Sequence, residues 1–209
     1  MKPKAIVLLS SGLDSTVNFC AAVRKFNVVL ALTFDYGQKA FQREMEKSQQ
    51  ICQQVQVFHK LISLPWLKEI ANSSLVAIDK NVPTGHELDI NDPIKCRESA
   101  QSVWVPNRNG IFLNVAAAFA ESMGADFVVS GFNAEEAVTF PDNSAEFLQA
   151  TDRVFYFSTQ SQVKNFCFTI HMTKKEIYKL GQELDAPFEL MWPCYFSGDE
   201  ICGECESCL

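Results

Sequence analysis

The chain has 209 residues, of which 47% are hydrophobic, and a formal net charge of −7. This length and composition predict one globular domain with a short appendage, and the negative charge argues against a protein that grips nucleic acid through its phosphates. Met-Lys-Pro-Lys leads straight into an apolar run, and no stretch approaches the ~20 apolar residues of a membrane span. We therefore expect a cytoplasmic protein without a membrane partner, in which eight cysteines are reduced thiols or metal ligands.

Short apolar runs alternate with segments of helical spacing along most of the chain. In chain order, these patterns predict a strand at 5–9, a helix at 15–25, a strand at 28–34, a helix at 41–54, a strand at 58–64, a helix at 109–123, a strand at 127–130, a helix at 144–159, a strand at 166–171 and a helix at 174–184.

Helix caps and one long interruption complete the pattern. Ser144 is suited to cap the helix that follows it, and Thr173 with Glu176 three residues later forms a capping-box sequence. Residues 65–107 are broken by prolines and give a weak signal. We expect them to be a functional or partly mobile insertion.

Strands that alternate with helices predict an α/β fold, an open parallel sheet with helices on both faces. Ligands of such sheets bind beyond the carboxyl ends of the strands. The loops at that edge are residues 10–15, 35–38 and 131–142.

The first of these loops, within the sequence LLSSGLDS at residues 8–15, is the most informative. A strand that turns tightly into a helix directs backbone N–H groups and the positive end of the helix dipole at one point, which suits a polyphosphate. The loop lacks the Gly-Lys-Ser/Thr of a Walker motif. Hydroxyls and amides would hold the pyrophosphate end and leave the α-phosphorus open, so the loop favours adenylation over kinase chemistry. The alternative is an ordinary helix start, with Ser11, Asp14 and Ser15 as capping or turn residues.

Four cysteines, Cys194, Cys202, Cys205 and Cys208, gather near the C-terminus with Gly203 between the second and third. Four thiolates at such spacing can surround a tetrahedral zinc at about 2.3 Å each. A redox dithiol and an iron–sulfur cluster are the alternatives. Zinc is favoured because all four ligands are local and the tail is too short to build its own core. Four protein ligands leave no open position, so the metal would be structural.

Several motifs together resemble a known family. Residues 10–15 resemble the SGGxDS pyrophosphate loop of N-type ATP pyrophosphatases, with Ser11 in place of a glycine. The whole chain resembles the 7-cyano-7-deazaguanine synthase family of queuosine biosynthesis. The matching motifs are FDYGQ at 34–38, VPNRN at 105–109 for VPGRN, the substrate loop at 131–142, K-x-E-I at 174–177 and the cysteine tail.

Two departures bear on the structure. Ser11 would fit the turn if its φ is negative. Residues 137–144, AVTFPDNS, stand where the family has YSGYPDCR, which bears on the substrate more than on the ATP chemistry.

The resemblance implies an adenine-nucleotide α-hydrolase-like, Rossmann-like ATP pyrophosphatase domain at residues 1–190, with a zinc-binding tail at 191–209 packed on it. It implies a ligase that converts 7-carboxy-7-deazaguanine and ammonia into 7-cyano-7-deazaguanine (preQ0) through an adenylated acid and an adenylated amide. The implied cofactors are ATP, Mg²⁺ and Zn²⁺, and the implied assembly is a homodimer. The alternatives are a diverged relative that stops at an amide or conjugate, and a non-catalytic zinc-containing nucleotide-binding module.

The resemblance also assigns site residues. ATP would contact Leu8, Leu9, Ser10, Ser11, Gly12, Leu13, Asp14, Ser15, Thr16, Phe34, Asp35 and Tyr36. The substrate would contact Arg108, Asn109, Gly131, Asn133, Glu136, Phe140 and Asp142. The catalytic residues would be Asp14, Ser15, Arg108 and Lys174.

Each assignment has a plainer alternative. Asp35 and Asp142 could cap turns, Arg108 and Asn109 could start a helix, and Lys174 could be a solvated first-turn residue. Their joint position at one sheet edge favours a site. Trp104, like Trp66 and Trp192, is expected to serve packing or an interface rather than to stack against a base.

Overall fold

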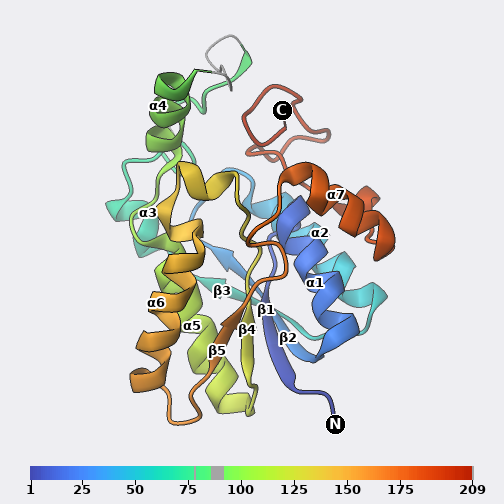
Figure 1. Ribbon diagram of the computed structural model, residues 1–209. Helices are drawn as coiled ribbons and strands as arrows, with labels where there is room; N and C mark the ends of the chain where they lie inside the picture. The colour runs from blue at the N-terminus through green and yellow to red at the C-terminus, as the bar shows by residue number, and fades with distance from the viewer. Residues whose placement is uncertain (78, 86–91, 209) are drawn as a thin grey trace.

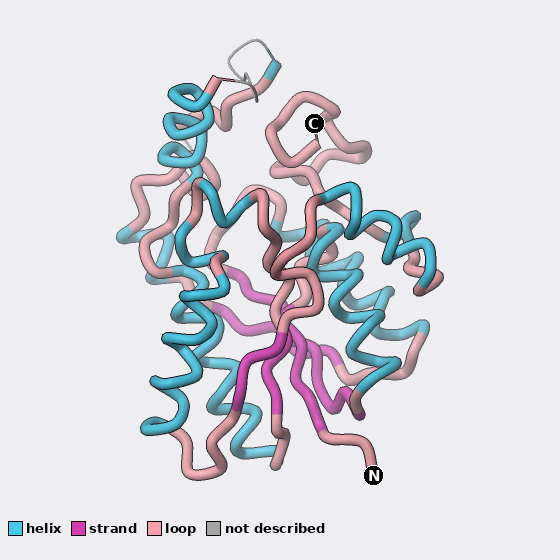
Figure 2. The backbone as a smooth tube through the Cα atoms, viewed as in Figure 1, coloured by secondary structure: helices cyan, strands magenta, loops and turns pink. Residues whose placement is uncertain are grey.

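The computed structural model describes residues 1–77, 79–85 and 92–208. Within these residues, five parallel strands form one sheet in the order β3-β2-β1-β4-β5 (Figure 1). The strands are β1 (Lys4–Leu8), β2 (Asn27–Asp35), β3 (His59–Ser63), β4 (Phe127–Val129) and β5 (Lys164–Phe166). The predicted parallel sheet is confirmed, and its carboxyl edge faces the cysteine tail (Figure 2).

Helices cover both faces of this sheet, as predicted. α1 (Leu13–Lys25) and α2 (Phe41–Gln54) pack on one face. α5 (Arg108–Met123) and α6 (Ala145–Ser158) pack on the other, and α7 (Lys174–Glu183) lies against α1 (Figure 1). None of the helices in the described residues is both long and apolar enough to span a membrane.

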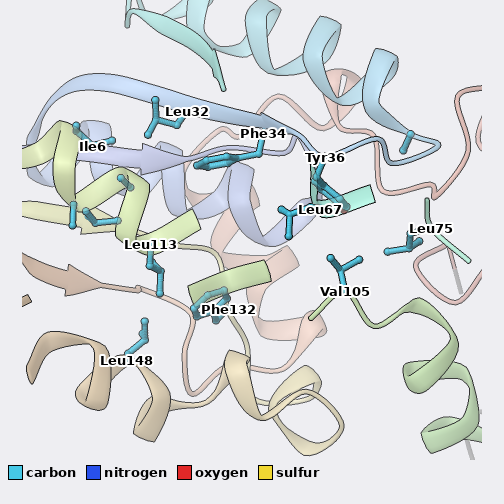
Figure 3. Close-up of a cluster of buried hydrophobic side chains, with 14 of the residues drawn as sticks. Ile6, Leu32, Phe34, Tyr36, Leu67, Leu75, Val105, Leu113, Phe132 and Leu148 are labelled. Atoms are coloured by element: carbon cyan, nitrogen blue, oxygen red, sulfur yellow. The ribbon is translucent and has the colours of Figure 1, made fainter. Parts of the chain in front are cut away.

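Two apolar cores follow from the alternation of side chains along β1. Ala5 and Val7 face α1 and α2 and pack with Phe19, while Ile6 faces the opposite side and packs with Leu113 of α5. All five side chains are fully or almost fully buried, and each of the larger ones contributes about 1.5–3 kcal/mol through burial. The α5-side core continues toward the loops at the carboxyl edge through the labelled side chains of Figure 3. The site loops therefore rest on a rigid, packed base.

The segment at 65–107 is more regular than expected. It contains α3 (Trp66–Ile70) and α4 (Pro93–Val103), while residues 78 and 86–91 lie outside the described part. The prolines weaken the helical signal without excluding a helix, because proline is compatible with the first turn of a helix, where its missing N–H costs nothing. Pro93 occupies that position in α4.

The last strand was placed too late in the chain. β5 ends at Phe166, although the alternation had suggested a strand at 166–171. The Phe168 N–H donates to Asn18 Oδ1 at 2.8 Å and the Thr169 hydroxyl donates to the Phe132 carbonyl at 2.6 Å. These long-range bonds draw the chain out of the sheet toward α1.

The two predicted caps are confirmed. Ser144 Oγ accepts the Phe147 N–H at 3.1 Å at the start of α6. At the start of α7, Thr173 and Glu176 form a reciprocal capping box. Because α7 is fixed in this way, its first residue, Lys174, has a defined position at the sheet edge.

Candidate active site and metal centre

The turn between β1 and α1 (residues 9–12) has an unusual backbone at Ser11. Its φ is +59°, in the left-handed region, so the condition of a negative φ, under which serine would fit the turn, is not met. This region costs an ordinary L-residue roughly 1–2 kcal/mol. The Ser11 hydroxyl donates to the Ser10 carbonyl at 2.6 Å, and the Ser11 carbonyl accepts the Trp192 N–H at 2.8 Å. These bonds hold the strained residue in place.

The first turn of α1 begins at Leu13, two residues earlier than expected. Gly12 is the N-cap, and among the described residues no side chain bonds to the first amides of the helix. The Ser15 hydroxyl instead binds the turn itself, because it accepts the Ser10 N–H and donates to the Gly12 carbonyl, both at 3.2 Å. No side chain of the described residues therefore caps α1. Its first amides and the positive end of its dipole are left to bind an anion.

Gly131, directly after β4, lies against this turn. A Cβ atom on Gly131 would lie 2.6 Å from both the N and the Cα of Ser15 and 2.8 Å from the carbonyl carbon of Asp14. Only glycine allows so close an approach of two backbones. The glycine therefore fixes the loop after β4 directly beside the first turn of α1.

A lysine from α7 reaches the same point. Lys174 Nζ lies 2.5 Å from Asp14 Oδ2 and 2.7 Å from Glu136 Oε1. Asn133 Nδ2 donates to Asp14 Oδ2 at 3.3 Å, and Asn133 Oδ1 accepts the Glu136 N–H at 2.9 Å. Two segments, α7 and the loop after β4, thus converge on the Asp14 carboxylate of α1.

Lys174 is cationic at neutral pH. Burial alone would lower its pKa, but the charges of Glu136 and Asp14 outweigh burial and raise the pKa well above its usual range. The Asp14 side chain is only 12% exposed, whereas that of Lys174 is 39% exposed. The ammonium group is paired with two carboxylates, so the plainer alternative of a merely solvated first-turn lysine does not fit.

A buried hydrogen-bond network holds the backbone of Asp14 in place. Asn18 Nδ2 donates to the Asp14 carbonyl at 2.8 Å and to Thr169 Oγ1 at 2.6 Å. Both side chains are fully buried. The sequence reasoning missed this pair, although an asparagine four residues after Asp14 in an apolar helix is the kind of buried polar residue that needs a partner.

The loop after β2 (residues 35–38) is organised by Gln38. Its side-chain Oε1 accepts the Tyr36 N–H at 3.0 Å, and its Nε2 donates to the Phe34 carbonyl and to Glu44 Oε2, both at 2.8 Å. Burial raises the pKa of Glu44 to about 7, against the opposing effects of Gln38 and Arg108. Glu44 was missed, and the spacing of six residues across a loop gives no local signal for it.

Asp35 has the turn-capping role considered as its alternative. Its Oδ1 accepts the Gly37 N–H at 3.0 Å. Its contribution to the edge of the sheet is to shape the loop that holds Tyr36.

A second cluster lies around Arg108. Arg108 Nη1 donates to the Tyr36 hydroxyl at 3.2 Å, and its guanidinium carbon lies 5.7 Å from the Tyr36 ring centroid. Asn109 Nδ2 donates to the Asp142 carbonyl at 3.4 Å. A small pocket here is lined by Val103, Trp104, Val105, Arg108, Phe140 and Asp142.

Asp142 lines this pocket and has one buried acceptor atom without a partner in the described part of the chain. Its Oδ1 is buried and has no hydrogen-bond partner among the described residues. Burial raises the pKa of Asp142, and Arg108 opposes that effect. A buried acceptor without a partner is costly, which is explained if a ligand supplies the donor.

Asn107 resembles Ser11 in its backbone. It stands where the family's motif has glycine, and its φ is +53°, in the left-handed region. Its side chain lies so close to Gly110 that a Cβ there would meet Asn107 Oδ1 at 2.2 Å. The glycine in α5 thus makes room for the asparagine that replaces the glycine of the motif.

The four tail cysteines form one cluster. Their Sγ atoms all lie within 4.8 Å of one another, with Cys202 and Cys208 at 3.9 Å and Cys205 and Cys208 at 3.4 Å. A tetrahedral metal with bonds of about 2.3 Å requires sulfur atoms about 3.8 Å apart. All eight cysteines are free thiols. The cluster is thus arranged for metal binding.

The tail is fastened to the sheet domain at several points. Arg43 of α2 pairs with Asp199 at 2.9 Å. The Gly85 N–H donates to the Glu204 carbonyl at 3.0 Å. Tyr195 also packs against the α5-side core, and burial raises the pKa of its hydroxyl well above the usual range.

The parallel sheet with its tight first turn belongs to the adenine-nucleotide α-hydrolase-like class of α/β folds. A 4-thiouridine synthetase, solved as an RNA complex with bound ATP, shares this fold with a TM-score of 0.51 and 19% sequence identity, over 96% of this chain and 44% of that one. The model of the family described as queuosine biosynthesis protein QueC matches residues 4–209. The chain belongs to this family.

Curated relatives agree over nearly the whole length. Proteins named 7-cyano-7-deazaguanine synthase are 55% identical in Bdellovibrio bacteriovorus and 53% identical in Carboxydothermus hydrogenoformans, each over 99% of this chain and over 90% and 95% of the relative. The relative of that name in Methanosarcina mazei is 49% identical over 99% of this chain and 90% of its own length. The resemblance inferred from the motifs is confirmed at the level of the family.

Proposed function

We propose that this protein is an ATP-dependent ligase that converts 7-carboxy-7-deazaguanine and ammonia into 7-cyano-7-deazaguanine. The observation that carries the proposal is that the family's motifs converge around Asp14 and Arg108. These motifs are the β1–α1 turn, the loops after β2 and β4 and the start of α7. The chain is also 55% identical to a curated synthase. Relatives that share this much sequence along their whole length share a reaction more often than a fold alone would imply.

The chemistry explains why ATP is needed twice. A carboxylate resists ammonia because it is anionic and offers no leaving group. Attack of a carboxylate oxygen on the α-phosphorus releases pyrophosphate and gives an acyl adenylate, from which ammonia displaces AMP to form the amide. The amide oxygen then attacks a second ATP, and loss of AMP and a proton leaves the nitrile. Each nitrile therefore consumes two ATP and releases two AMP and two pyrophosphates.

The β1–α1 turn would hold the nucleotide's phosphates. Backbone amides at the start of α1 and the hydroxyls of Ser10, Ser11 and Ser15 would bind the pyrophosphate portion. Lys174 would lie beside the α-phosphate and stabilise the negative charge that develops there. The nucleotide site would be completed by Leu8, Leu9, Leu13, Thr16 and residues 34–36.

Magnesium and zinc fit different donor sets. Asp14 Oδ1 is buried without a hydrogen-bond partner among the described residues, and a hard carboxylate oxygen beside phosphates is a preferred ligand for Mg²⁺. Bound there, the ion supplies charge neutralisation to the phosphates. The four-thiolate cluster fits Zn²⁺ without an open position, so we assign it a structural role.

The pocket around Arg108 would hold the second substrate. Asp142 Oδ1 would accept the adjacent N–H donors of the guanine-like edge, and such a match rejects analogues strongly because it would otherwise leave a buried acceptor unpaired. Arg108 would contact the substrate carboxylate or a phosphate. The passage between this pocket and the β1–α1 turn would be shaped by Asn109, Gly131, Asn133, Glu136 and Phe140.

We propose further that residues 1–190 form the ATP pyrophosphatase domain, that 191–209 form its zinc-binding tail and that the protein is a homodimer. Sedimentation equilibrium would test the dimer, and a mass equal to one chain would contradict it.

The experiment that tests the function is product analysis. The purified protein is incubated with 7-carboxy-7-deazaguanine, ammonium, ATP and Mg²⁺, and the products are followed by mass spectrometry. We expect the nitrile. Accumulation of the amide without nitrile would support a diverged amide-forming relative, and the absence of substrate-dependent pyrophosphate would support a non-catalytic nucleotide-binding protein.

A further inference from the structure

Trp104 is an aromatic residue that lines the Arg108 pocket. It follows the last residue of α4, and its ring lies parallel to that of Phe140, with an interplanar angle of 7° and 6.2 Å between the ring centroids. Both rings line the pocket together with Arg108 and Asp142. The sequence had suggested a role in packing or at an interface for this tryptophan, and its place in the pocket opens a further possibility.

The spacing of this ring pair differs from that of a packed core pair. Phe34 and Phe112 are just as parallel, at 6°, but their centroids are only 4.0 Å apart. The Trp104 and Phe140 rings are therefore parallel but farther apart than the core pair, and Trp104 is only partly buried. Aromatic surface that a neighbouring ring does not cover is available to a flat ligand.

The remaining pocket groups match the edges of one kind of flat ligand. The buried Asp142 Oδ1 requires a donor, which the N–H edge of a guanine-like ring provides. Arg108 provides a cation for an anionic substituent, and the aromatic wall provides a stacking surface. A bicyclic purine-like ring with a donor edge and a carboxylate satisfies all three features.

We propose that Trp104 is a positioning residue against whose indole the deazapurine ring of the substrate stacks. The proposal rests on the proposed function, and it assigns the aromatic surface that orients the ring toward Asp142. Loss of one base–aromatic stack weakens binding roughly 5- to 150-fold. Because this contact involves the ring and not the reacting carboxylate, its loss falls on substrate binding more than on turnover.

The test compares Trp104→Leu with Trp104→Phe in the full-length, zinc-loaded protein. We expect Trp104→Leu to raise the KM for 7-carboxy-7-deazaguanine roughly 5- to 150-fold, and the KM for ATP to change by less than about 2-fold. Trp104→Phe keeps a flat face and is expected to restore most of the affinity. Trp66→Leu is the matched control, because Trp66 lies in α3, is 43% exposed and does not line the pocket.

Tryptophan fluorescence gives a second readout that does not depend on the leucine variant folding. Addition of 7-carboxy-7-deazaguanine is expected to quench emission in the wild type and in Trp66→Phe, and to quench it much less in Trp104→Phe. Unchanged quenching in Trp104→Phe, an unchanged substrate KM in Trp104→Leu, or an equal rise in the KM for ATP would overturn the proposal. If the wild type neither binds nor converts this substrate, the proposed function itself fails, which is a separate outcome.

Discussion

Gly131→Ala tests whether the site depends on direct contact between two backbones. The new Cβ would lie 2.6 Å from Ser15 N and Cα, whereas ordinary contacts begin at 3.4 Å, so the first turn of α1 must move by about 0.8 Å. Neither neighbour is a flexible side chain that could rotate away. Overpacking of this kind costs about 1–3 kcal/mol, and a displacement of about 1 Å in a reacting group can cost about 100-fold in rate.

The assay combines calorimetry with AMP release. A cost of about 1–3 kcal/mol in a chain of this size lowers Tm by roughly 2–12 °C, and we expect the rate of AMP formation to fall about 100-fold. Gly12→Ala is the matched control for stability, because its Cβ would meet only Ser10 Oγ at 3.6 Å. Its Tm should fall by much less, whatever its effect on the rate. If Gly131→Ala keeps both its Tm and its rate, the close approach has no functional importance.

Three further changes probe other parts of the structure. Lys174→Gln removes the cation beside Asp14 and is expected to slow AMP formation roughly 100- to 1000-fold, whereas a rate within about 2-fold of wild type would exclude the role in charge stabilisation. Burial raises the pKa of Glu44 from 4.5 to about 7, so the folded protein holds that proton more tightly than the unfolded chain. Ionisation of Glu44 therefore destabilises the folded state, and this destabilisation grows as pH rises from about 4.5 to 7. Glu44→Gln should therefore stabilise the protein by about 1–3 kcal/mol more at pH 8 than at pH 5 in denaturant titrations, and a pH-independent effect of Glu44→Gln would contradict the inferred burial. Cys205→Ser should reduce the zinc content measured by atomic absorption and lower Tm, while Cys20→Ser, outside the cluster, keeps its zinc; full zinc occupancy in Cys205→Ser would exclude this thiolate as a ligand.

The alternation of strands and helices was predictable because its signals are local. The apolar runs of β1 and β2 are buried on both faces, and the caps at Ser144 and Thr173 depend only on neighbours three residues away. The end of β5 was not predictable, because it depends on a bond from Phe168 to Asn18 at 150 positions' distance in the chain. Alternation of apolar and polar residues along a strand gives no information about a distant hydrogen bond that replaces strand pairing.

The site was predictable in composition but not in geometry. Motifs identified Asp14, Glu136 and Lys174, yet only the fold shows that one ammonium group bridges the two carboxylates. Ser11 shows a different limit. The motif's glycine at that position was itself a signal for positive φ, which glycine adopts freely, and the φ of +59° shows that serine accepts the same conformation here.

Oxygen tracing tests the proposed adenylation chemistry at the reacting atoms. 7-Carboxy-7-deazaguanine labelled with ¹⁸O at both carboxylate oxygens is converted in unlabelled water, and the nucleotide products are analysed by mass spectrometry. If the acid and then the amide each attack the α-phosphorus, every AMP released carries one ¹⁸O and the nitrile carries none. Label in orthophosphate together with ADP, or AMP without label, would contradict activation at that phosphorus.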